Sequence, residues 1–171
     1  MKKLSAKKYA LFSAIILLGI GIDQFTKLLT VKFLKPIHSV PIIENVIHLT
    51  YVENRGAAFG MLSDSRWVFM IISSIAILGM IFFLYSGFAP NLLYEISIAM
   101  IISGGIGNMI DRTFLGHVVD MIDFRLINFA VFNGADSFVC VGAGLLILAL
   151  ILDIIKDSKV KKEKENDSDS N

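Results

Sequence analysis

Long apolar segments alternate with shorter polar ones along most of this chain. Four of them approach the length of about 20 residues that a helix needs to cross a lipid bilayer, at about residues 9–29, 67–88, 92–110 and 136–155. Residues 38–60 differ, because hydrophobic and polar residues alternate there in steps of two, which is typical of strands. We therefore predict an all-α membrane protein with four transmembrane helices and a small β-sheet between the first two.

Charged residues indicate how the predicted helices are oriented. Lysines cluster before the first apolar segment and after the last: Lys2, Lys3, Lys7, Lys8, Lys156, Lys159, Lys161, Lys162 and Lys164. Because basic flanks stay in the cytoplasm, we predict that both termini are cytoplasmic and that the sheet is extracytoplasmic. The first apolar segment lacks a small-x-small cleavage site, so we interpret it as a retained helix and not as a signal peptide.

The composition sets the domain organisation. With 55% hydrophobic residues, the chain is too apolar for a soluble domain of its length. Residues 1–158 are predicted to form one integral membrane domain. Residues 159–171 are charged and rich in Ser, Asp and Asn, and they predict a disordered cytoplasmic tail. We expect Glu95 to lie near the cytoplasmic headgroups without a particular role.

Ionisable residues gather at the extracytoplasmic ends of the predicted helices, where they are costly unless they line a polar site. Asp23 and Lys27 are four residues apart on one helix face and predict an ion pair. Asp111 ends the third helix, Asp120 follows it, and Asp136 starts the fourth. Two carboxylates that share one proton can activate water, as in aspartic proteases. We favour Asp120 and Asp136 as that pair, because a loop near the membrane surface can face a helix start.

Other chemistries have weaker support. None of His38, His48 and His117 has zinc-ligand spacing, and we expect His48 to be a surface residue. Cys140 is the single cysteine, and we interpret it as a small buried hydrophobe. We expect no metal and no cofactor. A small proton- or ion-coupled transporter that uses the same carboxylates is the alternative function, although a proton relay needs acids across the bilayer depth.

Five short motifs follow one another between the apolar segments. They are Asp23-Gln-Phe-Thr-Lys27, Asn54-Arg-Gly-Ala-Ala-Phe-Gly60, Gly107-Asn-Met-Ile-Asp-Arg112, Gly116-His-Val-Val-Asp120 and Phe132-Asn-Gly-Ala-Asp-Ser137. In this order they resemble the lipoprotein signal peptidase family, the bacterial signal peptidases II, from Asp23 to about Gly142. The resemblance implies that Asp120 and Asp136 are the catalytic pair.

The resemblance also implies roles for neighbouring residues. Seven would bind substrate or shape the site, namely Asn54, Arg55, Gly56, Asn108, Arg112, Asn133 and Ala135, and three would support it structurally, namely Asp23, Lys27 and Asp111. The implied reaction removes the signal peptide from a diacylglyceryl-modified prolipoprotein, just before the lipidated cysteine. The implied location is the bacterial cell membrane, among its lipids, with the active site at the extracytoplasmic face. Cyclic peptides of the globomycin type are the implied inhibitors, and no nucleic acid is expected as a partner.

Overall fold

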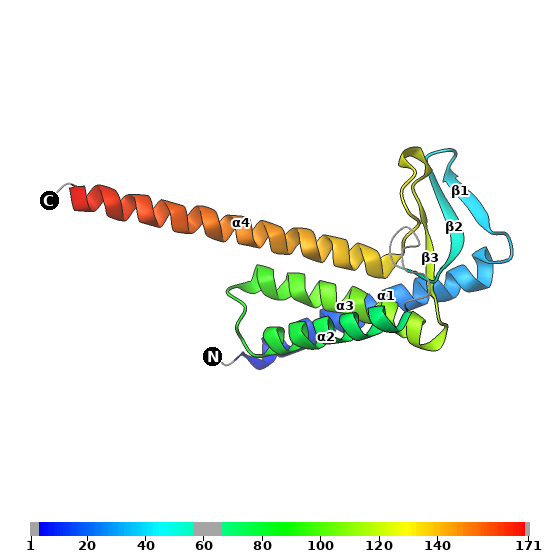
Figure 1. Ribbon diagram of the computed structural model, residues 1–171, viewed down its shortest axis with the longest axis horizontal. Coiled ribbons are helices and arrows are strands. Elements are labelled where there is room, and N and C mark those ends of the chain that lie inside the picture. The colour runs from blue at the N-terminus through cyan, green and yellow to red at the C-terminus, as the bar shows by residue number, and fades with distance from the viewer. Residues whose placement is uncertain (1–3, 57–65, 170–171) are drawn as a thin grey trace.

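The computed structural model describes residues 4–56 and 66–169. Its elements, in chain order, are α1 (Ala6–Leu29), the π-helix η1 (Thr30–Leu34), β1 (Ser39–Ile43), β2 (Ile47–Asn54), α2 (Arg66–Tyr85), α3 (Leu92–Phe114), β3 (Val118–Asp123), the 3-10 helix η3 (Arg125–Ile127) and α4 (Gly134–Asp169). The α-helices run along one long axis with the sheet at one end, and α1 begins and α4 ends at the other (Figure 1). A mostly helical protein with a small sheet is the predicted fold class.

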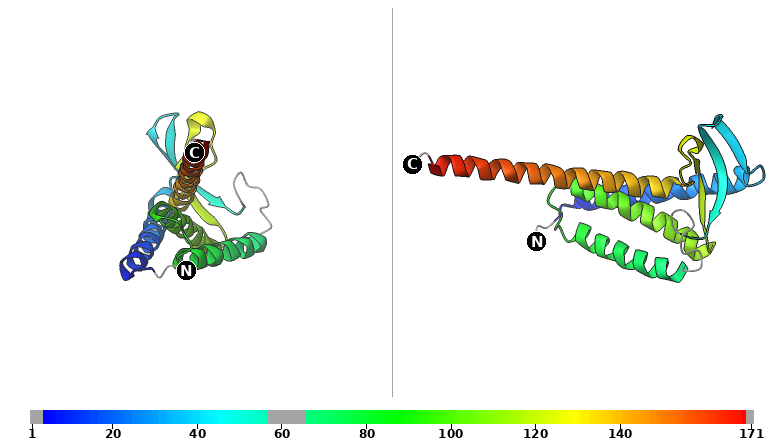
Figure 2. Two further views of the ribbon diagram at one scale, coloured as in Figure 1. Left: turned by 90° about the vertical axis from the view of Figure 1, so that its left-hand side faces the viewer. Right: turned by 45° about the horizontal axis from the view of Figure 1, so that its top comes forward.

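The sheet joins two distant parts of the chain. It is antiparallel in the order β1-β2-β3, and its strands run across the helix axis (Figures 1 and 2). β1 and β2 form a hairpin within the segment predicted to be a sheet, whereas β3 comes from the chain that follows α3. Pairing of β2 with β3 places Val52 opposite Asp120 and Asn54 opposite Val118. This register brings the end of β2 beside the strand that carries Asp120.

α3 is the central helix, and it packs against α1, α2 and α4. Two glycines allow this close packing. A Cβ atom at Gly107 would lie 2.6 Å from Asp23 Oδ2, and a Cβ atom at Gly104 would collide with the carbonyl oxygen of Ala135. Small residues permit such close approach between membrane helices, so these glycines let polar groups of α1 and α4 reach α3.

Several helices are suited to a membrane. Within the described residues, three stretches are long and apolar enough to cross one, namely Ala6–Leu34, Leu92–Phe114 and Gly134–Lys161, and Met70–Tyr85 in α2 is a shorter apolar helix. On α2, the side chains of Ile71, Leu78 and Phe82 are 58%, 65% and 67% exposed. Soluble monomers rarely expose apolar surface of this extent, so lipid hydrocarbon is the environment that suits these helices.

α4 is helical to Asp169, and the disordered cytoplasmic tail expected for residues 159–171 stays a prediction. Two other features differ from the prediction. Glu95 is only 2% exposed, and its carboxylate lies 2.7 Å from Lys8 Nζ. His48 is 7% exposed, and it lies in β2 between Pro41 of β1 and Asp123 of β3.

Candidate active site

A cavity of about 550 Å³ opens where the helices meet the sheet. Its polar side chains come from different elements: Asn54 from β2, Asn108 and Arg112 from α3, Asp120 from β3 and Asp136 from α4. The rest of the wall is mostly apolar and consists of Val118, Phe129, Ala130, Val131, Phe132, Ser137, Cys140 and Val141. A few convergent polar groups in an apolar concave surface are typical of a substrate pocket.

Asn133 connects the two aspartates of this pocket. Its side-chain Nδ2 donates a hydrogen bond to Asp120 Oδ1 at 2.6 Å, and its backbone N–H donates to Asp136 Oδ2 at 3.2 Å. A single residue thus contacts both carboxylates, one on a strand and one on a helix. The structure therefore brings together the two aspartates that the sequence singled out.

The start of α4 explains the position of Asp136. Asn133 precedes the helix, and its Oδ1 accepts the N–H of Asp136 at 2.9 Å while the Asp136 carboxylate accepts the N–H of Asn133. This reciprocal pair is a capping box, in which the N-cap residue and the residue three positions later satisfy each other's backbone groups. From α3, Asn108 Nδ2 donates to Asp136 Oδ1 at 2.7 Å. Both oxygens of Asp136 thus have an N–H donor.

Asp120 is held in a similar way but in a more buried position. It is 1% exposed, and Asn54 Nδ2 donates to its Oδ2 at 2.9 Å while Asn133 occupies its Oδ1. Burial raises the pKa of Asp120 to about 6, repulsion from Asp136 adds to this rise, and the two amide hydrogen bonds oppose it. A carboxyl group with this pKa can hold or release a proton near neutral pH.

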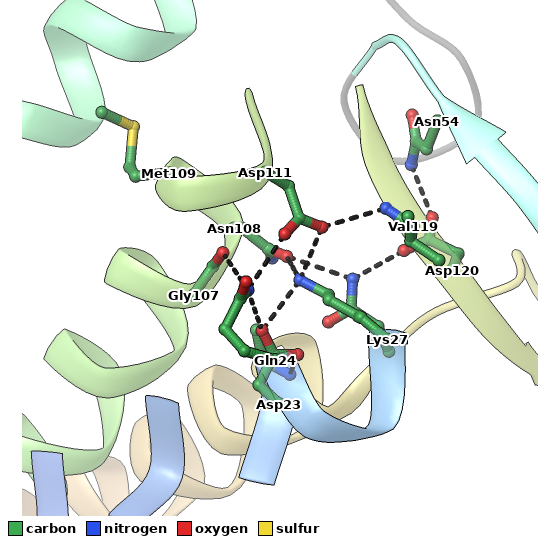
Figure 3. A network of polar contacts seen from close by, with 12 residues as sticks. Asp23, Gln24, Lys27, Asn54, Gly107, Asn108, Met109, Asp111, Val119 and Asp120 are labelled. Carbon is green, nitrogen blue, oxygen red and sulfur yellow. Dashed lines mark hydrogen bonds and ion pairs between the residues drawn. The ribbon is translucent and has the colours of Figure 1, made fainter. Parts of the chain in front are cut away.

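A buried network of polar contacts surrounds Lys27 (Figure 3), and it includes Asn108, which lines the pocket. Lys27 is 3% exposed, and its Nζ lies 2.9 Å from Asp23 Oδ2 and 2.9 Å from Asp111 Oδ2. The same Nζ donates to Asn108 Oδ1 at 3.0 Å. The predicted ion pair between Asp23 and Lys27 is confirmed, and the structure adds Asp111 to it.

Comparison with known proteins places this chain in a family. Residues 15–152 match the family model described as Signal peptidase (SPase) II. The chain belongs to the signal peptidase II family. A lipoprotein signal peptidase of Caldanaerobacter subterraneus is 49% identical over 132 residues, which are 77% of this chain and 90% of that relative. One of Clostridioides difficile is 45% identical over 141 residues, which are 82% of this chain and 95% of that relative.

A solved structure of a bacterial membrane enzyme has the same fold. It superposes with a TM-score of 0.79 at 33% identity and covers 85% of this chain and 90% of its own. Members of the signal peptidase II family are aspartic-type peptidases, so this protein is a membrane enzyme of that type.

In this signal peptidase II chain, each acid of the buried network holds the backbone next to one pocket aspartate. Asp111 Oδ2 accepts the N–H of Val119 at 3.1 Å, and Val119 precedes Asp120. Asp23 Oδ1 accepts the N–H of Ala135 at 2.8 Å, and Ala135 precedes Asp136. Because Lys27 pairs with both acids, one lysine connects the two backbone segments that carry the pocket aspartates.

Asn54 is oriented by the chain that follows it. Gly56 donates its N–H to Asn54 Oδ1 at 3.0 Å, and this leaves Nδ2 facing Asp120. Arg112 donates from its guanidinium to the carbonyl oxygen of Gly56 at 3.2 Å. The predicted residues Asn54, Gly56 and Arg112 therefore form one connected group that ends at Asp120.

Arg55 lies apart from this group. Its side chain is 72% exposed and 3.8 Å from Glu53, and it is not among the residues that line the cavity. A role for Arg55 in the site stays a prediction. Residues 57–60, the end of the same motif, lie outside the described residues.

Two residues near the site were missed or misjudged from the sequence. Gln24 Nε2 lies 3.1 Å from Asp23 Oδ2, 3.1 Å from the carbonyl oxygen of Gly107 and 3.0 Å from Asp111 Oδ1. Its position between Asp23 and Lys27 in the first motif could have indicated that it belongs to the network. Cys140, interpreted as buried, is exposed and lines the cavity. It follows Asp136 by four residues on α4, so helical periodicity alone places it on the face of Asp136.

Proposed function

We propose that this enzyme removes the signal peptide from diacylglyceryl-modified prolipoproteins by cutting just before the lipidated cysteine. In this proposal, Asp120 and Asp136 act on one water molecule between them. The observation that carries it is the bridge through Asn133, which holds both carboxylates at one pocket by bonds of 2.6 and 3.2 Å. Family membership and the names of the relatives support the substrate class.

The chemistry needs one ionised and one protonated carboxyl group. The ionised group takes a proton from water, whose oxygen attacks the carbonyl carbon before the cysteine, while the protonated group donates to the carbonyl oxygen. In the second step the carbon–nitrogen bond breaks, and the first carboxyl group passes its proton to the departing cysteine nitrogen. Two close carboxylates favour this sharing of one proton, because each disfavours the charged form of the other.

The membrane arrangement is part of the proposal. We infer four transmembrane spans within one integral domain of residues 1–158, with cytoplasmic termini and the pocket at the extracytoplasmic surface of the bacterial cell membrane. The clustered lysines near both termini support this orientation. The apolar wall that includes Phe129, Val131 and Val141 suits a lipidated substrate and the surrounding lipid, and cyclic peptides of the globomycin type would compete for the same pocket.

The distribution of charge favours the peptidase over the proton- or ion-coupled transporter. No acidic or basic residue occurs in residues 9–22, 67–94, 96–110 or 137–152 of the sequence. The acids near the pocket are thus separated along the helices from Glu95 and Asp153, whose partners are Lys8 and the hydroxyl of Tyr94. A proton relay requires ionisable groups spread across the bilayer depth.

The test is cleavage of a diacylglyceryl-modified prolipoprotein by purified enzyme in detergent. Asp120→Asn and Asp136→Asn are expected to reduce kcat by about 10²–10⁴-fold, because each removes a group that transfers a proton. Asp157→Asn is the matched control, since Asp157 is an exposed carboxylate far along α4, and it should cleave like the wild type. Near wild-type cleavage by either folded pocket variant would refute the two-carboxylate mechanism, and equal cleavage of unlipidated precursor would refute the substrate class.

A further inference from the structure

The buried Lys27 has more partners than a structural ion pair needs. A lysine ammonium carries three N–H donors. Asp23 Oδ2, Asp111 Oδ2 and Asn108 Oδ1 lie 2.9, 2.9 and 3.0 Å from Nζ, so all three donors have an acceptor. Two of these bonds lead to carboxylates of the support network. The third leads to an amide, and that amide continues into the pocket.

Asn108 passes the influence of Lys27 on to Asp136. Its Oδ1 accepts from Lys27, and its Nδ2 donates to Asp136 Oδ1 at 2.7 Å. A cation on the oxygen of an amide polarises the group and strengthens its N–H as a donor. The Lys27–Asn108–Asp136 chain therefore places a positive charge one amide away from a pocket carboxylate, in surroundings where the charge is poorly screened.

Asp120 has a different set of contacts. Its donors are the neutral amides of Asn54 and Asn133. Asn133 Nδ2 also donates to Asn108 Oδ1 at 3.1 Å, so the hydrogen-bond path from Lys27 to Asp120 contains one more amide than the path to Asp136. The two pocket carboxylates thus stand at unequal distances along the chain of hydrogen bonds that starts at Lys27.

The charges that surround the pair must be considered together. From α1 come Asp23 and Lys27, and from α3 come Asp111 and Arg112, whose guanidinium donates to the carbonyl oxygen of Gly56. Together with Asp120 and Asp136, this makes four carboxyl groups for two cations. One proton on the aspartate pair would leave a net charge of −1, and loss of that proton would leave −2, so the position of Lys27 matters for which carboxylate is ionised.

We propose that Lys27 is a positioning residue for the reaction, which acts through Asn108 to keep Asp136 ionised. On this basis Asp136 takes the proton from water and Asp120 donates its own proton to the substrate carbonyl oxygen. When the carbon–nitrogen bond breaks, Asp136 gives its proton to the leaving nitrogen, and Asp120 recovers a proton from a hydroxyl of the intermediate as the new carbonyl forms. This assignment rests on the proposed two-aspartate function, and it specifies which aspartate acts as the base and which as the acid.

The test is the pH dependence of kcat/KM for variants of Lys27. Lys27→Met removes the charge, and the rise of kcat/KM on the acidic side should move to higher pH by about one unit, because a nearby opposite charge favours a carboxylate. Lys27→Arg keeps the charge and should restore the wild-type position. Asp111→Asn removes a negative charge beside Lys27 and should move the rise in the opposite direction. A purely structural role for Lys27 would lower stability or kcat but would leave the position of this rise unchanged.

The remaining outcomes are also decisive. If Lys27→Met does not fold, because Asp23 and Asp111 are left without a cation, the double variant Lys27→Met/Asp111→Asn is compared with Asp111→Asn alone, and the same shift to higher pH is expected. An unshifted profile in a folded Lys27 variant overturns the proposal. Asp120→Asn and Asp136→Asn are measured in the same assay, so activity in those variants identifies a failure of the two-aspartate function itself.

Discussion

Buried acids paired with lysines occur at both ends of the helical part, but the two arrangements differ. At the end away from the sheet, Lys8 is the one partner of the Glu95 carboxylate among the described residues, and the Lys8 side chain is 40% exposed. At the sheet end, Lys27 is buried and connects two acids and an amide, and its network reaches an open cavity. The first arrangement joins two helices, whereas the second also holds the backbone before the two pocket aspartates. A buried charge whose contacts continue into a pocket is therefore a better guide to function than one that only joins two helices.

The helix caps at the two ends give the sharpest contrast. Asn133 caps α4 beside the pocket, and Asn91 caps α3 at the far end, where its Oδ1 accepts the N–H of Leu93 at 2.9 Å. Asn133→Ala should reduce kcat by about 10²-fold or more, because Asp120 loses its Nδ2 donor and the helix start that carries Asp136 loses its cap. Asn91→Ala should cost about 1 kcal/mol of stability and leave kcat unchanged within about threefold. Equal effects of the two variants on kcat would remove the distinction between the ends.

Chemical labelling of Cys140 tests which end contains the substrate pocket. This thiol is the single cysteine of the chain and lines the cavity. A bulky maleimide on it should reduce kcat/KM about tenfold, because it displaces substrate from its reactive position. The control is Cys140→Ser/Ser158→Cys, which moves the thiol to the exposed far part of α4 and should lose no activity on labelling. Loss of activity on labelling of the control variant would contradict the prediction that substrate binds in the cavity beside Cys140.

The pH dependence of stability should reflect the burial of Asp120. Its pKa is raised to about 6 in the folded protein, so the native state binds more protons than the unfolded state between about pH 4 and 6. Wild-type stability should therefore fall as pH rises through this window, by up to about 3 kcal/mol. Asp120→Asn removes this effect. Measured by thermal unfolding, the stability of the variant relative to the wild type should therefore increase as the pH rises from 4 to 6.5. A constant difference between the two proteins across this range would contradict the assignment.

The smallest effect is expected at the far ion pair. Lys8→Ala leaves the buried Glu95 carboxylate without its cation and should cost about 1–2 kcal/mol, less than for a fully buried pair because Lys8 is half exposed. The control is Lys7→Ala at the exposed neighbouring position. Cleavage rates well below the unfolding temperature should stay within about twofold of wild type for both. A large loss of kcat in Lys8→Ala would mean that the far end also takes part in the reaction.

Local regularity explains what could be predicted from the sequence. Asp23 and Lys27 were expected to pair because four residues make one helical turn, and their atoms lie 2.9 Å apart. Asp136 was expected at a helix start because polar residues precede a long apolar segment. The four predicted apolar segments begin within three residues of the starts of α1, α2, α3 and α4, since the need for an apolar helix of bilayer length leaves little choice.

Contacts between distant segments explain what could not be predicted. Glu95 lies far from Lys8 in the sequence, and nothing in either segment indicates that they pair. His48 was misjudged because alternation shows that a residue is in a strand but not which face of that strand the rest of the chain covers. Asp111 accepts the N–H of Val119, and Asp23 accepts the N–H of Ala135. These hydrogen bonds depend on how α3 lies against its neighbours, which a single sequence does not specify.

The position of Asp136 in the first turn of α4 also has a consequence for biosynthesis. The groups that contact it come from α3 and from the cap of α4 itself, and the backbone before it is held by α1. A ribosome makes α4 after α1, α2 and α3, and its capping box forms only when that helix has folded. The nascent chain therefore has no complete aspartate pair until α4 has been made, and under the proposed mechanism a product truncated before α4 is inactive.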